Sequence, residues 1–344
     1  MTTALLSIRQ GRVTLRKTMV WCAALIVALL LTVLIAALIG SEKLPTNASA
    51  CSILSVGMNP CGLTRDQLDI LFQIRLPRIL LAAAVGGSLA TAGASYQALL
   101  RNPLAEPYLL GVSNGAAVGT MLALVFFGTF EWSRPFMAFV GSLLATFAVY
   151  RLGRGRVGAT PERLILAGVI VTTLLSSVIV FVTTLMDATR IRSFTFWLLG
   201  DLSGANRRLL PLTISVAVIG TVILTLNARS LNLLMLGERD AFDLGVEVSR
   251  VRITVFLVAS LLVGSSVASS GSVGYVGLVV PHLARLSLGS DNRISIPSAA
   301  ILGALFVIIA DTVARTIIAP RELPVGAITA LIGAPLFIYL LKRD

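Results

Sequence analysis

The stretch Arg75–Gly119 reads RLPRILLAAAVGGSLATAGASYQALLRNPLAEPYLLGVSNGAAVG and is the most informative part of this chain. It contains two apolar runs joined by a short polar turn. Small residues recur every four positions in each run, which places them on one face of a helix: Gly86, Ala90 and Ala94 in the first, and Gly111, Gly115 and Gly119 in the second. Such ridges let helix backbones approach closely in lipid, so the stretch predicts a tightly packed bundle of membrane-spanning helices.

The remainder of the chain has the same character. Of its 344 residues, 56% are hydrophobic and 13% are charged, whereas a soluble domain carries about 25% charged residues. Apolar runs near the length of a bilayer span recur throughout, which excludes a soluble protein with one large core. We predict an all-α polytopic membrane protein with about ten spans, near residues 19–40, 76–99, 109–127, 135–150, 161–186, 209–226, 251–269, 273–288, 295–318 and 324–341.

The net charge of +12 would suggest a nucleic-acid partner in a soluble protein. Here the arginines lie between apolar runs and act as topology signals, most clearly Arg151, Arg154, Arg156 and Arg163. The positive-inside rule then predicts one transmembrane domain over 1–344, with a cytoplasmic N-terminus (1–18), an extracytoplasmic loop (41–74) and a cytoplasmic segment (227–250). An even number of spans places both termini in the cytoplasm, and the first apolar run is expected to be a retained helix of a plasma-membrane protein.

Two of the three cysteines, Cys51 and Cys61, lie in the loop 41–74. An extracytoplasmic loop would allow a disulfide between them, and two free thiols are the alternative. Cys22 lies inside the first apolar run, and no Cys/His cluster has the spacing of metal ligands. We therefore expect no metal and no cofactor in this chain.

Charges inside the predicted spans are scarce; the main candidates are Asp311 and Arg315, one helical turn apart. Ion-coupled transporters depend on buried ionisable groups, so a secondary transporter or channel is the weaker alternative. A membrane enzyme lacks support, because the sequence shows no nucleophile–base or metal constellation. The G-x-x-x-x-G-K-[ST] motif does not occur, so ATP could drive the protein only through another subunit.

The polar segment Asn227–Arg250 is too long for a turn. It contains two short helix-like pieces, 230–236 and 238–244, which are broken at Gly237 and Gly245. One interpretation is an interfacial helix pair on the lipid headgroups. The other is a docking element for a cytoplasmic partner, and the residues by themselves leave both open.

The most specific part of the opening stretch is RNPLAEPYLLGVSNG (Arg101–Gly115). Three later blocks follow in order: LGERDAFDLGV (Leu236–Val246), GSVGYVGLVVPHLAR (Gly271–Arg285) and ADTVARTIIAPRELPVGAITALIGAPLFIYLL (Ala310–Leu341). Together these blocks resemble the FecCD-type permeases of ABC importers for iron-siderophores, haem and cobalamin. The resemblance covers nearly the whole chain from Arg75 onward, while the loop 41–74 is less typical.

The resemblance implies a BtuC-like permease fold that works as a homodimer, with pairing to a related permease left open. Two cytoplasmic ATPase subunits would bind ATP and Mg, so this chain is a transport subunit and not an enzyme. An extracytoplasmic binding protein would deliver the cargo, and nucleic acid has no role. Iron-siderophore is the first expectation for the cargo because it is the commonest in the family, with haem and cobalamin as alternatives.

The resemblance also implies roles for individual residues. Arg75, Arg78 and Arg315 match positions that pair with glutamates of the binding protein, against the alternatives of helix-end anchoring or an Asp311–Arg315 pair. The expected ATPase-coupling residues are Leu236, Gly237, Ala241, Phe242, Leu244 and Gly245. Thr160 and Pro161, which suit the N-cap and first position of a helix, match the family's cytoplasmic gate, although ATPE (Ala159–Glu162) differs from its pattern. The lone His282 is expected to pack structurally.

Overall fold

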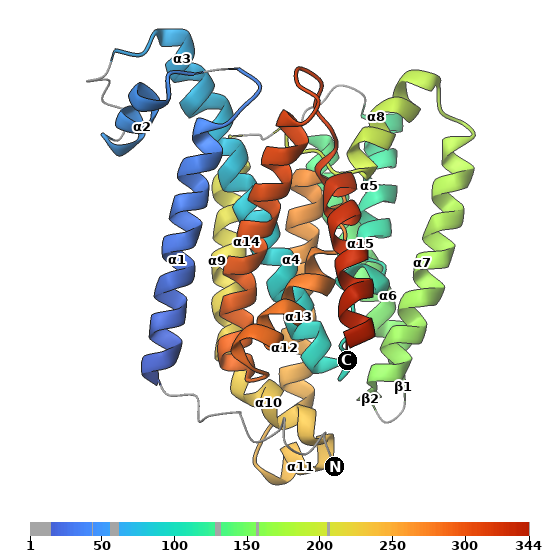
Figure 1. Cartoon of the computed structure of the whole chain (residues 1–344). Helices are drawn as coiled ribbons and strands as arrows, with labels where there is room; N and C mark the ends of the chain where they lie inside the picture. Colours follow the sequence, from blue (N-terminus) through green and yellow to red (C-terminus); the bar gives the residue numbers. More distant parts are fainter. Residues whose placement is uncertain are drawn as a thin grey trace.

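The computed structural model describes residues 15–42, 44–55, 62–127, 132–155, 158–204 and 207–343. Most of them lie in helices that run side by side as a bundle (Figure 1). The elements are α1 (Leu15–Leu38), α2 (Thr46–Leu54), α3 (Arg65–Asp69), the π-helix η2 (Ile70–Arg75), α4 (Leu76–Leu99), the 3-10 helix η3 (Pro107–Leu110), α5 (Val112–Phe126), α6 (Ser133–Gly153), β1 (Arg154–Gly155), β2 (Gly158–Ala159), α7 (Pro161–Thr183), α8 (Ala188–Leu198), α9 (Leu210–Leu226), α10 (Ala228–Leu236), α11 (Glu238–Asp243), α12 (Val248–Ser270), α13 (Val276–Leu288), α14 (Asn292–Thr316) and α15 (Val325–Arg343).

The all-α class is confirmed, and each predicted span matches one helix with ends shifted by a few residues: α1, α4, α5, α6, α7, α9, α12, α13, α14 and α15. By length and composition, five helices of the described chain can cross a membrane, namely α1, α6, α7, α12 and α14. A sixth is added if α9 and α10, bent by 49° at their junction, count as one span. Of the remaining matches, α5, α13 and α15 are shorter apolar helices.

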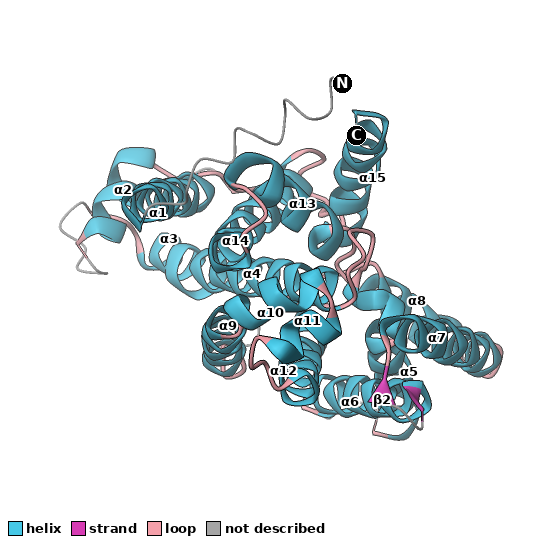
Figure 2. Cartoon of the chain, turned by 90° about the horizontal axis from the view of Figure 1, so that it is seen from below, coloured by secondary structure: helices cyan, strands magenta, loops and turns pink. Residues whose placement is uncertain are grey.

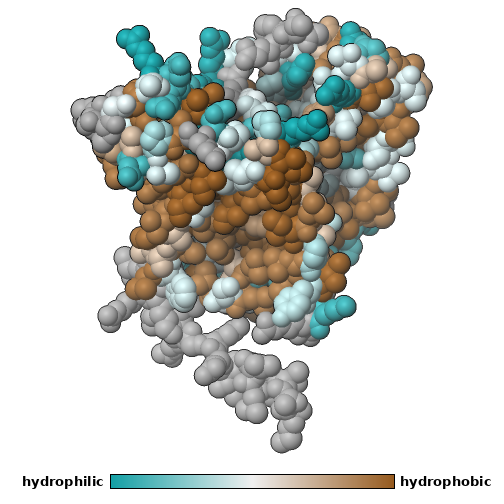
Figure 3. All heavy atoms as spheres, turned by 45° about the horizontal axis from the view of Figure 1, so that its top comes forward, coloured by the Kyte–Doolittle hydropathy of each residue, from teal (hydrophilic) through white to brown (hydrophobic). Residues whose placement is uncertain are grey.

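The outer surface of the bundle is apolar. Leu30 on α1 and Leu174 on α7 are 64% and 62% exposed, and many other large hydrophobic side chains are equally uncovered. Figure 3 shows a broad hydrophobic band, with hydrophilic side chains gathered at the end of the bundle that carries α2 and α3. A soluble protein does not expose so much contiguous apolar surface, so this band is the part that faces lipid.

The core is organised around α4, which is buried along nearly its whole length. It packs against α14, α12, α13 and α9, and viewed along the bundle it lies in the middle (Figure 2). A Cβ atom at Gly86 would lie 2.1 Å from the carbonyl oxygen of Gly303 on α14, so only glycine allows this approach. Gly115 of α5 meets Gly141 of α6 in the same way, which confirms that the small-residue ridges are helix contacts.

Two helices, α13 and α15, begin inside the protein and not at its surface. The N–H of Val325 at the start of α15 donates to the carbonyl of Gly200, with an N–O distance of 3.1 Å. The Tyr108 hydroxyl donates to the Val273 carbonyl and accepts from the Val273 N–H, each at 3.0 Å. Non-helical backbone at membrane depth must find its partners within the protein, and these bonds supply them.

The loop 41–74 and the segment 227–250 lie at opposite ends of the bundle (Figure 1). In the loop, α3 begins with a capping box in which Thr64 and Gln67 bond each other's backbone N–H groups. Cys51 is disulfide-bonded and Cys22 is free. Cys61, the expected partner of Cys51, lies outside the described residues.

Candidate functional site

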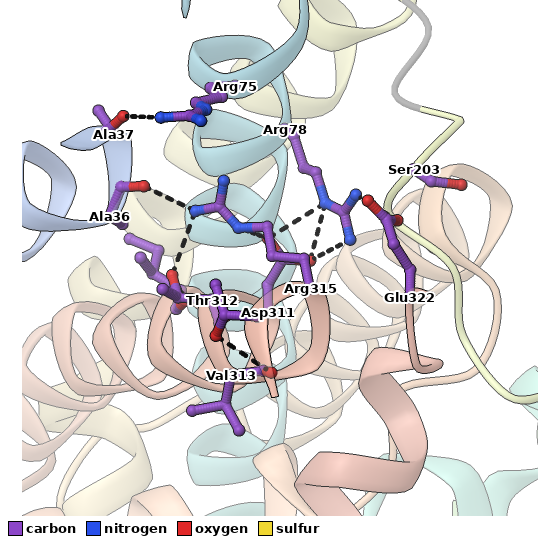
Figure 4. A network of polar contacts seen from close by, with 12 residues as sticks. Ala36, Ala37, Arg75, Arg78, Ser203, Asp311, Thr312, Val313, Arg315 and Glu322 are labelled. Carbon is purple, nitrogen blue, oxygen red and sulfur yellow. Dashed lines mark hydrogen bonds and ion pairs between the residues drawn. The ribbon is translucent and has the colours of Figure 1, made fainter. Parts of the chain in front are cut away.

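The three arginines predicted to receive a binding protein come together at the end of the bundle that carries the loop 41–74. Arg75 ends η2, Arg78 lies in the first turn of α4, and Arg315 lies in the last turn of α14. Figure 4 shows the Arg78 and Arg315 guanidinium groups beside Asp311, and that of Arg75 beside Ala37 at the end of α1. All are buried: Arg75, Arg78 and Arg315 are 4%, 6% and 4% exposed, and Asp311 is 1% exposed.

Arg78 is held by two carboxylates. On one side, its Nε donates to Asp311 Oδ1 at 2.9 Å and its Nη2 lies 2.8 Å from the same oxygen. On the other side, its Nη1 donates to Glu322 Oε2 at 2.7 Å. The Glu322 side chain, in the turn between α14 and α15, is 39% exposed, so this second partner faces solvent while Asp311 does not.

Arg75 and Arg315 bind the C-terminal end of α1. Arg75 Nη1 donates to the Ala37 carbonyl at 3.0 Å, and Arg315 Nη2 donates to the Ala36 carbonyl at 2.7 Å. The last carbonyls of a helix have no partner inside the helix and carry partial negative charge, so cations are favourable there. Arg315 Nε also lies 3.5 Å from Asp311 Oδ2, so the sequence alternative of an Asp311–Arg315 pair is present in the structure.

In this structure the side chains of all three arginines therefore form hydrogen bonds within the chain. Their role in docking the binding protein stays a prediction. Arg78 and Arg315 share Asp311, Arg78 also pairs with Glu322, and the negative charge of Glu42 acts on Arg75. Sequence reasoning missed Glu322 and the role of α1. No local pattern could have found them, because Arg78 and Glu322 are 244 positions apart.

At the opposite end, α10 and α11 form the predicted pair of short helices, broken at Gly237. The backbone there has φ 152°, and Gly245 after α11 has φ 84°, both in the region that favours glycine. Three of the six predicted coupling residues are exposed apolar side chains: Leu236 at 68%, Phe242 at 71% and Leu244 at 61%. The fourth residue, Ala241, is buried against the bundle, and the other two are glycines. The segment thus presents an apolar tip on a fixed base.

Polar side chains hold this base in place. Glu238 of α11 lies 2.5 Å from Arg252 of α12, measured between Oε1 and Nη2. Asn232 of α10 donates to Asp291 Oδ1 at 2.7 Å, next to the start of α14. The neighbouring Arg293 guanidinium lowers the pKa of Asp291 to about 2, which keeps that acceptor ionised. These partners were not predicted from the sequence.

Thr160 and Pro161 open α7 as predicted, with Thr160 extended (φ −93°, ψ 155°) and Pro161 as the first helical residue. The turn before them is the hairpin of β1 and β2, in which Arg154 pairs with Ala159. Their role as a gate stays a prediction. His282 of α13 stands edge-on to the Phe337 ring of α15, with centroids 6.3 Å apart, as structural packing requires.

Known proteins resemble this chain in both sequence and fold. The model of the FecCD transport family matches residues 12–343. The cobalamin import system permease BtuC of Halobacterium salinarum is 43% identical over 82% of this chain and 75% of its own length. The hemin transport permease HmuU of Yersinia pestis is 40% identical, over 82% of this chain and 86% of its own. The iron(3+)-hydroxamate import permease FhuG of Bacillus subtilis is 37% identical with the same two coverages.

A solved structure has a similar fold over most of the chain. It is an inward-facing conformation of a metal-chelate type ABC transporter, 32% identical in sequence, with a TM-score of 0.81. The alignment covers 94% of this chain and 98% of that one. The BtuC-like permease fold is therefore confirmed for this chain.

Proposed function

Because this chain belongs to the FecCD transport family, we propose that it carries an iron-siderophore across the plasma membrane as the permease subunit of an ABC importer. The observation that carries the proposal is the family match over residues 12–343, which spans both the arginine cluster and the apolar tip. Relatives with this match are named as import permeases for cobalamin, hemin and iron(3+)-hydroxamate. A metal chelate is thus the cargo class, and the siderophore is our specific assignment within it.

The assembly that we propose contains two copies of this chain, two ATPase subunits and one binding protein. The ATPase subunits dock at the end that carries α10 and α11, and ATP is hydrolysed there and not on this chain. The exposed side chains of Leu236, Phe242 and Leu244 support this assignment, because an apolar tip held on a fixed base can enter a groove and take up a mechanical push. That end, where α15 also finishes, is then the cytoplasmic one (Figure 1).

Transport in reconstituted vesicles tests the function. The chain is inserted with its cognate ATPase and supplied with binding protein outside. We expect ATP-dependent uptake of a ferric hydroxamate siderophore, and no uptake when the ATPase is omitted. Uptake that proceeds without the ATPase would point to a secondary transporter or channel. Faster uptake of haem or cobalamin under the same conditions would replace the siderophore as cargo.

The arginine cluster suggests how a binding protein could be received. We propose that a carboxylate of that protein replaces Glu322 at Nη1 of Arg78, since this is the solvent-facing side of the guanidinium. Glu322→Gln should then raise the affinity for the binding protein up to about fivefold, because an exposed ion pair contributes at most about 1 kcal/mol. Surface plasmon resonance on the detergent-solubilised complex measures it.

Asp187→Asn is the matched control, because Asp187 is a 57% exposed carboxylate at the same end that pairs with Arg190 and not with the cluster. It should leave the affinity unchanged. An unchanged affinity in Glu322→Gln as well would remove Arg78 from the docking surface.

A further inference from the structure

A cavity of about 660 Å³ lies between α6, α9 and α12, at the end of the bundle that also carries the arginine cluster. Its walls are almost wholly apolar and include Phe136, Leu212, Val216 and Ala268, with Trp132 at the start of α6. The volume falls in the range of about 300–1,000 Å³ that small-molecule sites occupy. Because α12 packs against both α6 and α9, the cavity has a floor of protein and is more than a groove between two helices.

A second cavity of about 240 Å³ continues the first. The two share part of their lining, including Pro135, Thr213 and Ala268. Unlike the first cavity, this one has charged and polar side chains among its apolar lining. One cation, Arg134, and one carboxylate, Asp201, line it together with hydroxyl groups of Ser193 and Ser270.

Both cavities lie at the same end of the bundle, where α6 and α9 begin and α12 ends. The apolar cavity is lined by the first two turns of α6 and α9 and the last turns of α12, helices whose outer faces are apolar. The second cavity adds Arg134 and Asp201 at this end, which is where such helices reach the headgroup layer. Trp132 marks the same level, because tryptophan prefers the membrane–water interface.

We propose that these joined cavities bind one glycerophospholipid with a phosphoethanolamine headgroup. An acyl chain occupies the apolar cavity, Arg134 binds the phosphate, and Asp201 accepts a hydrogen bond from the ammonium. One cation and one carboxylate complement a zwitterion better than an anionic headgroup. A quaternary ammonium cannot donate hydrogen bonds, so phosphatidylcholine meets Asp201 less well than phosphatidylethanolamine does.

Quenching of Trp132 fluorescence by brominated acyl chains tests the site in the full chain reconstituted in vesicles. The other two tryptophans are replaced by Trp21→Phe and Trp197→Phe, so that Trp132 alone reports. In mixtures, brominated phosphatidylethanolamine should bind about two- to fivefold more strongly than brominated phosphatidylcholine, the range expected for one exposed ion pair. Equal binding of the two lipids, or stronger binding of phosphatidylglycerol, would overturn the headgroup assignment.

Four variants test the site. Asp201→Asn should abolish it, whereas Asp187→Asn, at the same end but outside both cavities, should retain it. Ala268→Leu narrows the junction of the cavities and should lower quenching in every lipid. Native mass spectrometry gives a second readout: one phosphatidylethanolamine per chain should co-purify and be lost in Arg134→Gln. A preference that survives Asp201→Asn, or a lipid retained in Arg134→Gln, would show that the lipid does not bind here.

Discussion

Asp311→Asn should destabilise the protein by about 3–5 kcal/mol, the cost of removing one partner from a buried ion pair. Asp311 is 1% exposed and is the carboxylate that Arg78 and Arg315 share. An amide in its place keeps the shape, but it removes the carboxylate that Arg315 pairs with and leaves Arg78 with Glu322 as its one anionic partner. The midpoint of thermal unfolding in detergent, followed by size-exclusion chromatography, measures the loss.

Glu322→Gln is the matched control. It removes the other carboxylate that pairs with the Arg78 guanidinium, and the Glu322 side chain is 39% exposed. It should cost at most about 1 kcal/mol. Replacing both members of the buried pair, with Asp311→Leu and Arg78→Leu, should recover part of the loss, since an apolar pair of similar volume is often tolerated. Equal midpoints for Asp311→Asn and Glu322→Gln would show that burial does not set the strength of these contacts.

Phe242→Ala combined with Leu244→Ala should release the ATPase without disturbing the fold. Side chains that anchor an interface cost about 2 kcal/mol or more when truncated, so each substitution should weaken association by about thirtyfold. The folded chain should be unaffected because both side chains are more than half exposed. Co-purification of the ATPase and ATP-driven uptake measure the effect, and the thermal midpoint reports the fold.

Leu226→Ala provides the comparison. Leu226 ends α9 just before α10 and is 77% exposed. Its truncation to alanine therefore removes a similar apolar surface outside the proposed tip. Association of the ATPase should be unchanged in this variant. If the double variant of Phe242 and Leu244 also keeps its ATPase, the segment is an interfacial helix pair on the membrane, as the other interpretation of the sequence holds.

The sequence predicted the helices well because apolar length and small-residue spacing are local properties. The range 76–99 coincides with α4, and the break at Gly237 separates α10 from α11 as expected. The eighth span was predicted from residue 273, but α13 begins at Val276, because Tyr275 adopts a left-handed conformation with φ 67°. In a Gly-rich stretch, the sequence does not reveal at which residue the helix begins.

The arginine cluster shows what sequence reasoning could not reach. The Asp311–Arg315 pair was foreseeable, since residues four apart share a helix face. The stronger contact joins Arg78 to Asp311 across 233 positions, and only the packing of α4 against α14 creates it. Arginines at helix ends suggested outward-facing charges, whereas the end of α1 covers two of them and accepts their hydrogen bonds.

Because α13 and α15 begin inside the protein, some contacts of the fold can form only late in synthesis. Val273 finds its partner in Tyr108, and Gly200 finds its partner in Val325, the first residue of the last helix. Until that helix has left the ribosome and entered the bilayer, the Gly200 carbonyl lacks its protein partner. The contact that fixes the turn after α8 therefore forms only when synthesis of the chain is nearly finished.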